Sequence, residues 1–331
     1  MMRGRAGRRF SADGAIVALR RYCPFPGHGS FAMFDPFVPT LDCAGRPLAL
    51  DRPRIAGIVN VTPDSFSDGG DFLDVERAIA HGIALVQQGA DLLDVGGEST
   101  RPGAEEVSAE EEIARVVPVI RALAARTSVP ISVDTSKPAV MRAAVAAGAG
   151  LINDVYALRR DGALAAAAEL QVPICLMHMQ GEPRSMQQEP HYDDVVGEIR
   201  RFLTDRVFSA ELAGIPRSRL LIDPGFGFGK TVEHNCMLLR ELRQFADLGA
   251  PLLVGLSRKS FLGQLSGRTA PAERVHASVA AALIAAQRGA AILRVHDVAA
   301  TADALRVWAA VTGTAAPRRP AAAPVRWGDD D

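Results

Sequence analysis

From residue 55 onward, short apolar runs alternate with longer, alanine-rich segments in which apolar residues recur at helical spacing. The apolar runs lack a polar–apolar alternation, which is typical of strands buried on both faces of a parallel sheet. Several helical segments end in glycine directly before the next apolar run, and glycine is a common stop signal for a helix. The strands predicted from this pattern are residues 55–60, 91–95, 130–134, 151–154, 173–177, 220–223, 252–256 and 292–295. The helices predicted to follow them are residues 74–88, 108–126, 137–147, 161–170, 192–213, 232–246, 271–288 and 298–311.

Eight successive strand–helix units in a chain of 331 residues predict a (β/α)8 barrel. The alternative is a doubly wound open sheet, but that fold usually has fewer units and a glycine-rich turn directly after its first strand. No such turn follows residues 55–60 directly. Ahead of the barrel, residues 40–54 hold a Gly-Arg-Pro turn between two short apolar pieces, which predicts a β-hairpin that plugs the bottom of the barrel.

Both ends of the chain differ in composition from this central pattern. Residues 1–33 begin with several arginines, and their apolar run at 15–19 is too short for the core of a signal peptide. Residues 314–331 are rich in alanine, proline and arginine. We therefore expect a disordered leader at 1–33, one barrel domain at 34–313 and a disordered tail at 314–331.

Composition narrows the range of partners. A hydrophobic content of 48% with 23% charged residues indicates a well-filled globular core. The net charge of -1 argues against nucleic acid or a membrane surface as a partner, and no apolar run approaches the roughly 20 residues of a membrane span. The four cysteines show neither a CxxC pair nor histidines at metal-ligand spacing, which favours a reducing, cytoplasmic location over a disulfide framework or a zinc site.

Polar residues stand at nearly every predicted strand end. In such barrels the carboxyl ends of the strands carry the functional groups, so these residues are expected to face one site. Single members could be structural; Asp94 and Asp154, for example, could cap helices or bind backbone. The set as a whole predicts a polar ligand, because desolvating so many ionisable groups costs free energy without one. Its members are Asn60, Asp94, Asp134, Asn153, Asp154, His178, Asp223, Ser257, Lys259, Arg294 and His296.

The charges of this set indicate a phosphorylated, flat ligand. Basic residues follow the seventh and eighth strands, where barrels commonly bind phosphate, and Arg101 adds another, so a diphosphate is predicted. Asn60 and carboxylates of the loop after it could complete the shell of Mg2+. A basic surface patch paired with acids is the alternative. The basic residues after those two strands are Arg258, Lys259, Arg294 and His296.

Acceptors and donors also mix at neighbouring strand ends, as the edge of a flat heterocycle with amino, N–H and oxo groups requires. The residues concerned are Asp134, Asn153, Asp223 and Lys259. The glycine-rich residues 223–230 resemble a phosphate-binding loop, but Pro224 stands where that motif needs its first glycine. We interpret these glycines as letting the backbone approach the flat ligand, with Phe226 or Phe228 against it. No serine has the context of a hydrolase nucleophile, and His178, without a second metal ligand, is interpreted as core or pocket wall.

Seven motifs follow one another along the chain: NVTPDSFSDGG (60–70), DVGGESTRPG (94–103), VDTSK (133–137), INDV (152–155), DPGFGFGK (223–230), SRKS (257–260) and RVHD (294–297). In sequence and in order they are similar to those of bacterial dihydropteroate synthases. The resemblance spans about residues 40–311. It implies a barrel transferase that joins 4-aminobenzoate to (7,8-dihydropterin-6-yl)methyl diphosphate, giving 7,8-dihydropteroate and diphosphate, with Mg2+ as cofactor. It also implies a homodimer, for which the alanine-rich last helices could supply the face.

Carried over to this chain, the resemblance assigns a role to each matching residue. The pterin pocket would comprise Asp134, Asn153, Asp223 and Lys259, with Met177 as its wall. Asn60 would bind Mg2+, and Arg101, Arg294 and His296 would hold the diphosphate. Thr100, Pro102, Phe228 and Ser257 would flank the aminobenzoate, Phe66 would close over it, and Asp68 and Val295 would also contact substrate. The catalytic groups would be Asp134, Asp223, Lys259 and Arg294. A pterin-dependent methyltransferase and a non-catalytic pterin-binding paralogue are the alternatives.

Overall fold

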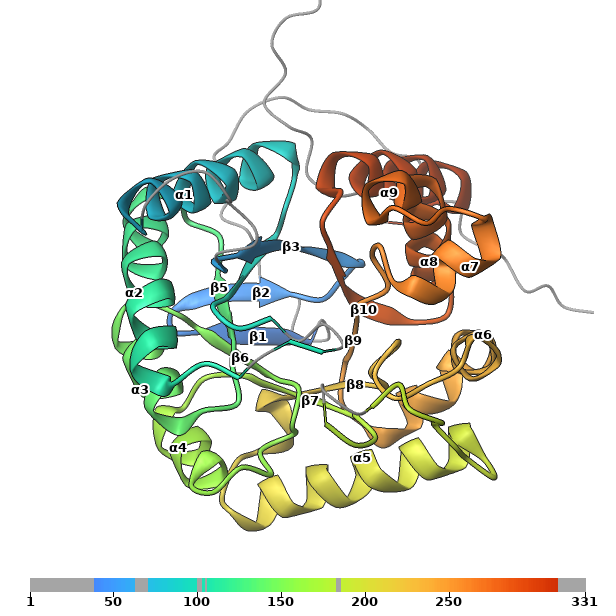
Figure 1. Cartoon of the computed structure of the whole chain (residues 1–331), viewed down its shortest axis with the longest axis horizontal. Coiled ribbons are helices and arrows are strands. Elements are labelled where there is room, and N and C mark those ends of the chain that lie inside the picture. The colour runs from blue at the N-terminus through green and yellow to red at the C-terminus, as the bar shows by residue number, and fades with distance from the viewer. Residues whose placement is uncertain (1–38, 63–70, 100–102, 105, 183–185, 315–331) are drawn as a thin grey trace, which may run out of the picture. The chain divides into compact units, whose positions relative to one another are not determined.

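The computed structural model of the chain describes residues 39–62, 71–99, 103–104, 106–182 and 186–314. Parallel strands close into an eight-stranded barrel in the order β10-β3-β4-β5-β6-β7-β8-β9, and helices surround it (Figure 1). The predicted (β/α)8 barrel is therefore confirmed. The barrel strands are β3 (Arg54–Asn60), β4 (Leu92–Gly96), β5 (Ile131–Asp134), β6 (Leu151–Asp154), β7 (Ile174–Met177), β8 (Leu220–Asp223), β9 (Leu252–Val254) and β10 (Ala290–Val295). The α-helices are α1 (Asp71–Gln88), α2 (Ala109–Arg126), α3 (Pro138–Ala146), α4 (Ala163–Leu170), α5 (Val195–Leu212), α6 (Val232–Arg240), α7 (Ser260–Ser266), α8 (Val275–Gln287) and α9 (Val298–Thr312).

The strands are buried on both faces, which explains why their sequences are apolar without alternation. Every residue of β4, β6, β7 and β8 is buried. The register sets the polar strand ends at one level, because Gly96 pairs with Asn60 on one side and with Asp134 on the other. Asp134 in turn pairs with Asn153. The site is thus built on backbone that the parallel ladder holds in place.

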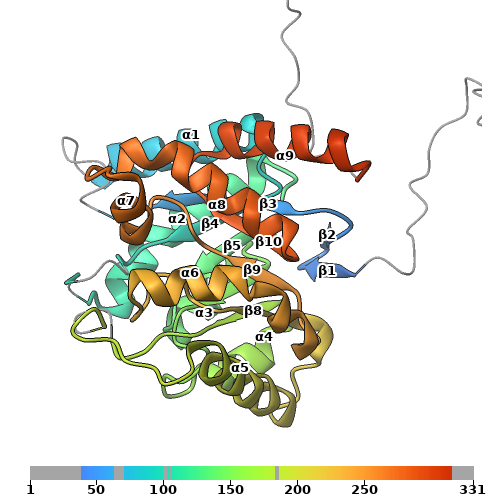
Figure 2. The same ribbon diagram turned by 90° about the vertical axis from the view of Figure 1, so that its right-hand side faces the viewer.

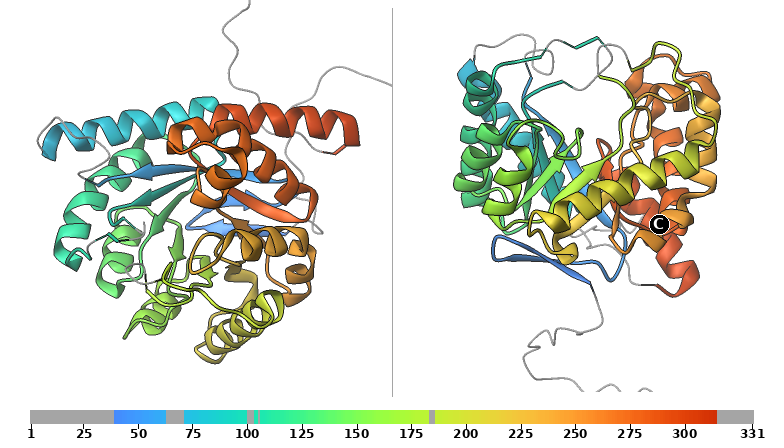
Figure 3. Two further views of the ribbon diagram at one scale, coloured as in Figure 1. Left: turned by 45° about the vertical axis from the view of Figure 1, so that its right-hand side comes forward. Right: turned by 90° about the horizontal axis from the view of Figure 1, so that it is seen from below.

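A two-stranded antiparallel hairpin, β1 (Thr40–Cys43) and β2 (Arg46–Ala49), lies across the amino-terminal end of the barrel (Figures 2 and 3). Its Leu41, Cys43 and Leu48 pack in one apolar cluster with inward-facing strand residues, so the predicted plug is confirmed. The approach is close: a Cβ on Gly150 would lie 2.4 Å from the carbonyl oxygen of Cys43. The strand residues in this cluster are Ala56, Leu92, Leu151, Cys175, Leu221, Leu253 and Ile292.

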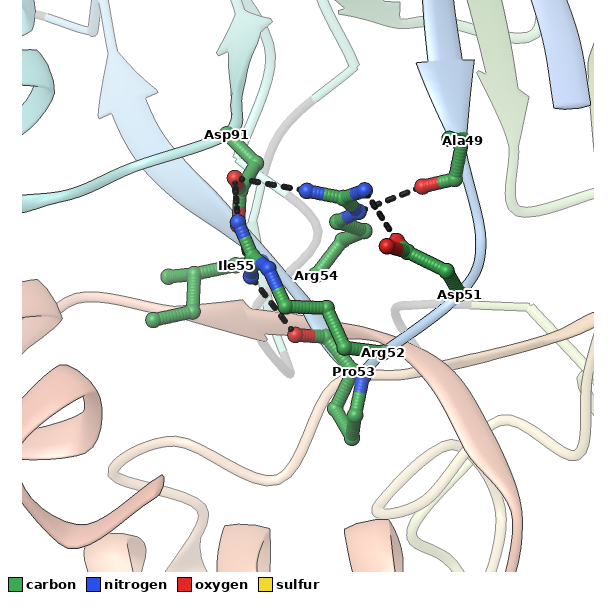
Figure 4. Close-up of polar contacts among 7 residues, drawn as sticks. All are labelled: Ala49, Asp51, Arg52, Pro53, Arg54, Ile55 and Asp91. Carbon is green, nitrogen blue, oxygen red and sulfur yellow. Dashed lines mark hydrogen bonds and ion pairs between the residues drawn. The ribbon is translucent and has the colours of Figure 1, made fainter. Parts of the chain in front are cut away.

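A buried ion cluster fastens the chain where it enters the barrel (Figure 4). Asp91 accepts hydrogen bonds from both terminal nitrogens of Arg52, at 3.0 and 2.5 Å, and from the backbone N–H of Ile55 at 3.0 Å. Arg54 adds a contact to the same carboxylate at 3.3 Å and binds Asp51. The side chains of Arg52 and Asp91 are only 5% and 4% exposed, so these contacts replace water almost completely. This cluster lies at the end of the barrel away from the polar strand ends.

Apart from shifts of one to three residues at element ends, the structure differs from the predicted elements in four places. The segment predicted as one helix at 232–246 is α6 followed by a 3₁₀ helix, Leu242–Leu248, in which Leu242 and Phe245 are buried. Their spacing of three residues fits a 3₁₀ turn as well as an α-helix, so the pattern could not separate the two. The segment at 271–288 likewise begins with a 3₁₀ turn, Pro271–Arg274, before α8. The short helix α7 was not predicted, and β9 ends at Val254 instead of residue 256.

Two further predictions concern the ends of the chain and membrane-spanning helices. The proposed leader and almost all of the proposed tail lie outside the described residues, so both domain boundaries stay predictions. Within the described part of the chain, no helix combines the length and the apolar character that a membrane span requires.

Candidate active site

Three strand ends are joined by one arginine. Arg294, from the end of β10, donates from Nε to Asp94 Oδ2 at 2.5 Å and from Nη2 to Asp134 Oδ2 at 2.7 Å. Asn153, on β6, donates to the same Asp94 oxygen at 3.5 Å. The other oxygen of Asp94 is buried and has no partner among the described residues. The structure thus brings together residues that are up to 200 positions apart in the chain.

Burial perturbs the ionisable groups of this site. It raises the pKa of Asp134 to about 7, although Arg294 opposes the shift. It raises the pKa of Asp223 to about 6, against the hydrogen bond from Gly225 and the nearby lysines. Burial and the charge of Arg294 lower the pKa of Lys259 to about 8. For Arg294 itself, burial is outweighed by Asp94 and Asp134, which raise its pKa. Such perturbed groups, gathered at one end of a barrel, are typical of an active site.

One wall of the site is apolar and rich in methionine. Phe228 and Met177 belong to a buried cluster that also holds Val155, Met179 and Met186. The ammonium of Lys259 lies 4.0 Å from the centroid of the Phe228 ring, which is a cation–π contact. Phe226, the other candidate for stacking, is 1% exposed and belongs to the main core, so Phe228 is the aromatic residue at the site.

The loop after β8 comes very close to β7. Gly225 has a φ of +70°, and a Cβ there would lie 1.8 Å from the carbonyl oxygen of His178, so the position requires glycine. The N–H of Gly225 donates to Asp223 Oδ1 at 2.7 Å and orients that carboxylate. Lys230 does not extend outward as a phosphate-binding lysine would. It is buried and donates to the carbonyl oxygen of Phe228 at 2.8 Å.

The basic cluster predicted after the last two strands divides into two parts. Arg258 is held by Asp297 through two bonds, at 3.1 and 2.6 Å. Like Arg294, it keeps N–H groups outside this pair, so its place among the anion-binding residues stays a prediction. Ser257 accepts from the backbone N–H of His296 at 3.1 Å, and its hydroxyl lies 3.0 Å from His296 Nδ1. Ser257 and His296 are thus a bonded pair beside Arg294 and the buried Val295.

Two of the other polar strand-end residues have structural partners. Asp154 accepts from the backbone N–H groups of Tyr156 and Leu158 at 2.8 and 2.7 Å, which matches the alternative that it binds backbone. His178 is buried as expected for a wall residue; burial and the charge of Lys230 lower its pKa to about 2. Asn60 ends β3 and is half-buried. The remaining predicted site residues lie outside the described residues: Phe66, Asp68, Thr100, Arg101 and Pro102.

Sequence reasoning missed a buried ion network under the loop after β4. Lys137 donates to Glu98 at 2.8 Å and to Glu112 at 2.7 Å, and Glu112 is fully buried on α2. Glu98 also accepts from the N–H of Val107 at 3.1 Å, which joins the two ends of its loop. A signal was present in the sequence, because Glu112 occupies the apolar stripe of its helix, where a lone carboxylate needs a partner.

Residues 56–296 of the chain match the family of pterin binding enzymes. The chain is 53% identical over 263 residues to the dihydropteroate synthase of Escherichia coli K12, covering 80% of this chain and 93% of that protein. The chain belongs to the dihydropteroate synthase family. The resemblance noted from the motifs is confirmed, and the chain is a transferase of this family.

Solved structures of this family agree with the barrel in detail. A dihydropteroate synthase from Xanthomonas albilineans with 4-aminobenzoic acid is 63% identical, with a TM-score of 0.80, over 84% of this chain and all of that one. The synthase from the same organism in complex with 7,8-dihydropteroate is 58% identical with a TM-score of 0.75, over 84% of this chain and all of that one.

Proposed function

We propose that this chain condenses (7,8-dihydropterin-6-yl)methyl diphosphate with 4-aminobenzoate, giving 7,8-dihydropteroate and diphosphate in folate biosynthesis. The observation that carries the proposal is the polar ring at the strand ends, where two carboxylates, an amide and a lysine lie beside an apolar aromatic wall. The 4-aminobenzoic acid and 7,8-dihydropteroate held by the X. albilineans relatives support the same substrate and product.

The pterin edge is assigned to Asp134, Asn153, Asp223 and Lys259. Carboxylates accept the amino and ring N–H groups of such a heterocycle, and lysine donates to its oxo group. Asn153 and Asp223 are buried, and Asp134 and Lys259 are half-buried. An unpaired buried group would cost about 1–3 kcal/mol, so the site selects a ligand of complementary pattern. Phe228, together with Met177, supplies the flat apolar surface on which the ring rests.

Catalysis in this proposal follows from charge. As the diphosphate departs, positive charge develops on the pterin methylene and spreads into the ring. Asp134 and Asp223, fixed by Arg294 and by the N–H of Gly225, stabilise that charge without reorganising. The weakly basic aryl amine then attacks the methylene carbon, its C–N bond replacing the broken C–O bond, and the amine loses a proton. No protein nucleophile is needed.

The diphosphate is assigned to Arg294, His296 and Arg101. Arg294 uses two of its N–H groups on Asp94 and Asp134. A guanidinium carries five, so Arg294 can bind the leaving group while still holding both carboxylates. The hydroxyl of Ser257, bonded to His296, orients that imidazole.

Magnesium is assigned to Asn60 together with the diphosphate. Among the described residues no cluster of three or more His, Cys, Asp or Glu side chains could hold a metal by itself. One amide oxygen at a strand end fits Mg2+, which keeps several waters and is usually shared with substrate phosphates. When bound, the ion would supply positive charge to the leaving diphosphate.

The remaining assignments concern the second substrate and the assembly. Ser257, Thr100, Pro102 and Phe228 flank the aminobenzoate, with Phe66 closing over it and with Asp68 and Val295 as further contacts. A homodimer through α8 and α9 is supported by exposed apolar side chains there, since Ile284, Val307 and Val311 are 38%, 66% and 81% exposed. We assign the enzyme to the cytoplasm on its scattered free cysteines.

Diphosphate release from the dihydropterin diphosphate, with and without 4-aminobenzoate, tests this proposal. We expect release to depend on aminobenzoate and to match dihydropteroate formation mole for mole. Pterin binding without release would leave a non-catalytic paralogue. Methyl transfer from methyltetrahydrofolate, in place of release, would establish the methyltransferase alternative.

A further inference from the structure

Lysine is rare in this chain, and every lysine follows the carboxyl end of a barrel strand. The sequence holds 34 arginines but only three lysines: Lys137, Lys230 and Lys259. All three follow the carboxyl ends of barrel strands, namely β5, β8 and β9. Lys137 and Lys230 are 8% and 4% exposed, and Lys259 is half-buried. Cationic groups on the outer surface and at the other end of the barrel are arginines throughout the described part of the chain.

The chemistry of the two side chains explains what such a division means. Arginine is a broad planar donor, and here it serves where several carbonyls must be reached, as Arg46 and Arg219 do. Lysine is a compact point charge with three donors, which fits where the backbone leaves room for one small group. The two lysines that share the pocket region with Lys259 are therefore candidates for a specific function.

Lys230 lies directly behind the aromatic wall of the site. Its Nζ donates to the carbonyl oxygen of Phe228 at 2.8 Å and lies 3.0 Å from His178 Nδ1. Burial lowers the pKa of both His178 and Lys230. The lysine nitrogen carries N–H donors in either protonation state and the imidazole is neutral, so Nδ1 of His178 can accept from it. His178 is itself held edge-on against Phe202, with ring centroids 4.8 Å apart. Lys230 thus ties Phe228 to a fixed point on the neighbouring strand end.

The peptide groups flanking Phe228 have separate supports. The N–H of Gly227 donates to Asn235 at 2.7 Å, and the carbonyl of Gly229 accepts from Tyr192 at 2.9 Å. The carbonyl oxygen of Phe228 accepts from Nζ of Lys230. The ring of Phe228 lies under the Nζ atom of Lys259. A shift of this one peptide would move the aromatic wall and the surface beneath Lys259 together.

We propose that Lys230, supported by His178, is a positioning residue that fixes Phe228 and, through it, Lys259 for the pterin. This inference rests on the proposed function, since it concerns the same pocket. Lys230 does not touch the substrate in this proposal. It acts from behind the wall, which is a role different from the phosphate binding that its glycine-rich motif suggests.

A lysine-selective carbon-13 NMR spectrum of the free full-length chain tests the geometry without any substrate. Three lysines give three ε-methylene signals, which single substitutions assign. We expect the Lys259 signal to be displaced by the ring current of Phe228. In Lys230→Met it should move back toward the position of an ordinary lysine. His178→Leu should have the same effect, whereas His178→Gln, which offers an oxygen acceptor, should keep the wild-type signal. These two variants decide the question if Lys230→Met does not fold.

Kinetics test the consequence for the reaction. We expect Lys230→Met to raise KM for the dihydropterin diphosphate about tenfold, with a smaller change in kcat. Its effect should not add to that of Phe228→Leu, because both act through one ring. The control is Arg219→Met, which removes a half-buried cation that binds the carbonyls of Ala167 and Val172 before β8. That variant should lose stability and keep both KM and the Lys259 signal.

The outcomes separate this inference from the proposed function. An unmoved Lys259 signal in Lys230→Met and His178→Leu would overturn the positioning role whatever reaction the chain catalyses. A Lys259 signal that is displaced in the wild type and moves back in Lys230→Met, in a protein that releases no diphosphate, would support the positioning role and contradict the condensation. If Lys230→Met and Arg219→Met lose the same stability and raise KM by the same factor, Lys230 is only a structural residue.

Discussion

Asp134→Asn should make the free protein more stable at high pH, and the size of the effect follows from burial. Burial raises the pKa of Asp134 from its ordinary 3.8 to about 7. Each pH unit between the unfolded and folded values is worth about 1.4 kcal/mol, so the folded state loses about 4 kcal/mol as the pH rises through this range. The sign is that of a raised folded-state pKa: the stability is fully present below pH 4 or so and is lost as the pH rises through about 7.

Asparagine does not ionise in this pH range, so the variant does not lose the unfolding free energy that the wild type loses as Asp134 ionises. Of the total, about 2–3 kcal/mol develops between pH 5 and pH 8. We therefore expect the difference in unfolding free energy, variant minus wild type, to rise by about that amount between the two pH values. Urea unfolding of the ligand-free chain at both pH values measures it. Losing the bond to Arg294 lowers the variant's stability, but the pH dependence of the difference remains.

Asp303→Asn is the matched control. Its side chain is 72% exposed and pairs with Arg306, so the difference from wild type should be nearly constant between pH 5 and pH 8. A flat profile for Asp134→Asn would refute the reasoning, because it would mean that Asp134 is ionised in the folded state as readily as in water. The same variant should lose most of its condensation activity, since a neutral amide cannot stabilise the developing cation.

Three further predictions concern groups around the site and at the bottom of the barrel. The pH profile of kcat/KM should fall above about pH 8, where Lys259 loses its proton, and Lys259→Arg should remove that alkaline limb; an unchanged limb would exclude Lys259 as its source. Lys137→Met should destabilise the fold by roughly 3–5 kcal/mol in urea unfolding, because it strands the buried Glu112. Lys137→Met should also raise KM for aminobenzoate, because Glu98 in the loop after β4 loses its anchor. Adding Glu112→Gln should recover most of the lost stability but not that KM, and full kinetic recovery would contradict this. Asp91→Ala should cost a similar roughly 3–5 kcal/mol without changing KM, because it uncouples the buried arginines away from the site, and a changed KM would refute that separation.

The barrel and the membership of the site could be read from local pattern. Strands buried on both faces are apolar without alternation, and polar residues at their ends stand out against that background. Asp134, Asn153, Asp223, Lys259 and Arg294 were found in this way, without knowledge of any contact between them. The aromatic wall was narrowed only to two phenylalanines, because the sequence does not indicate which one of an adjacent glycine-flanked pair faces the core.

The partners of these residues depend on closure of the barrel and could not be predicted. Arg294 meets Asp94 only because β10 pairs with β3, which brings the last strand beside the first. Arg258 could be recognised as a basic residue after β9, but its pairing with Asp297 appears only in the fold. The role of Lys230 was also hidden, because its motif suggests a phosphate contact while its neighbours, His178 and the Phe228 carbonyl, come from two strand ends. Local sequence specifies which groups reach the rim, and tertiary contacts decide what each group binds.

The strand-end residues are proposed to form one site that condenses the dihydropterin diphosphate with 4-aminobenzoate. The most direct test is aminobenzoate-dependent release of diphosphate with Mg2+ by the wild type, Lys259→Ala and Arg294→Ala, with Arg219→Met as the control. We predict release by the wild type and the control, and a loss of at least about 100-fold in both site variants. Release that survives in Lys259→Ala and Arg294→Ala, or a wild type that binds the pterin and releases no diphosphate, would contradict the account.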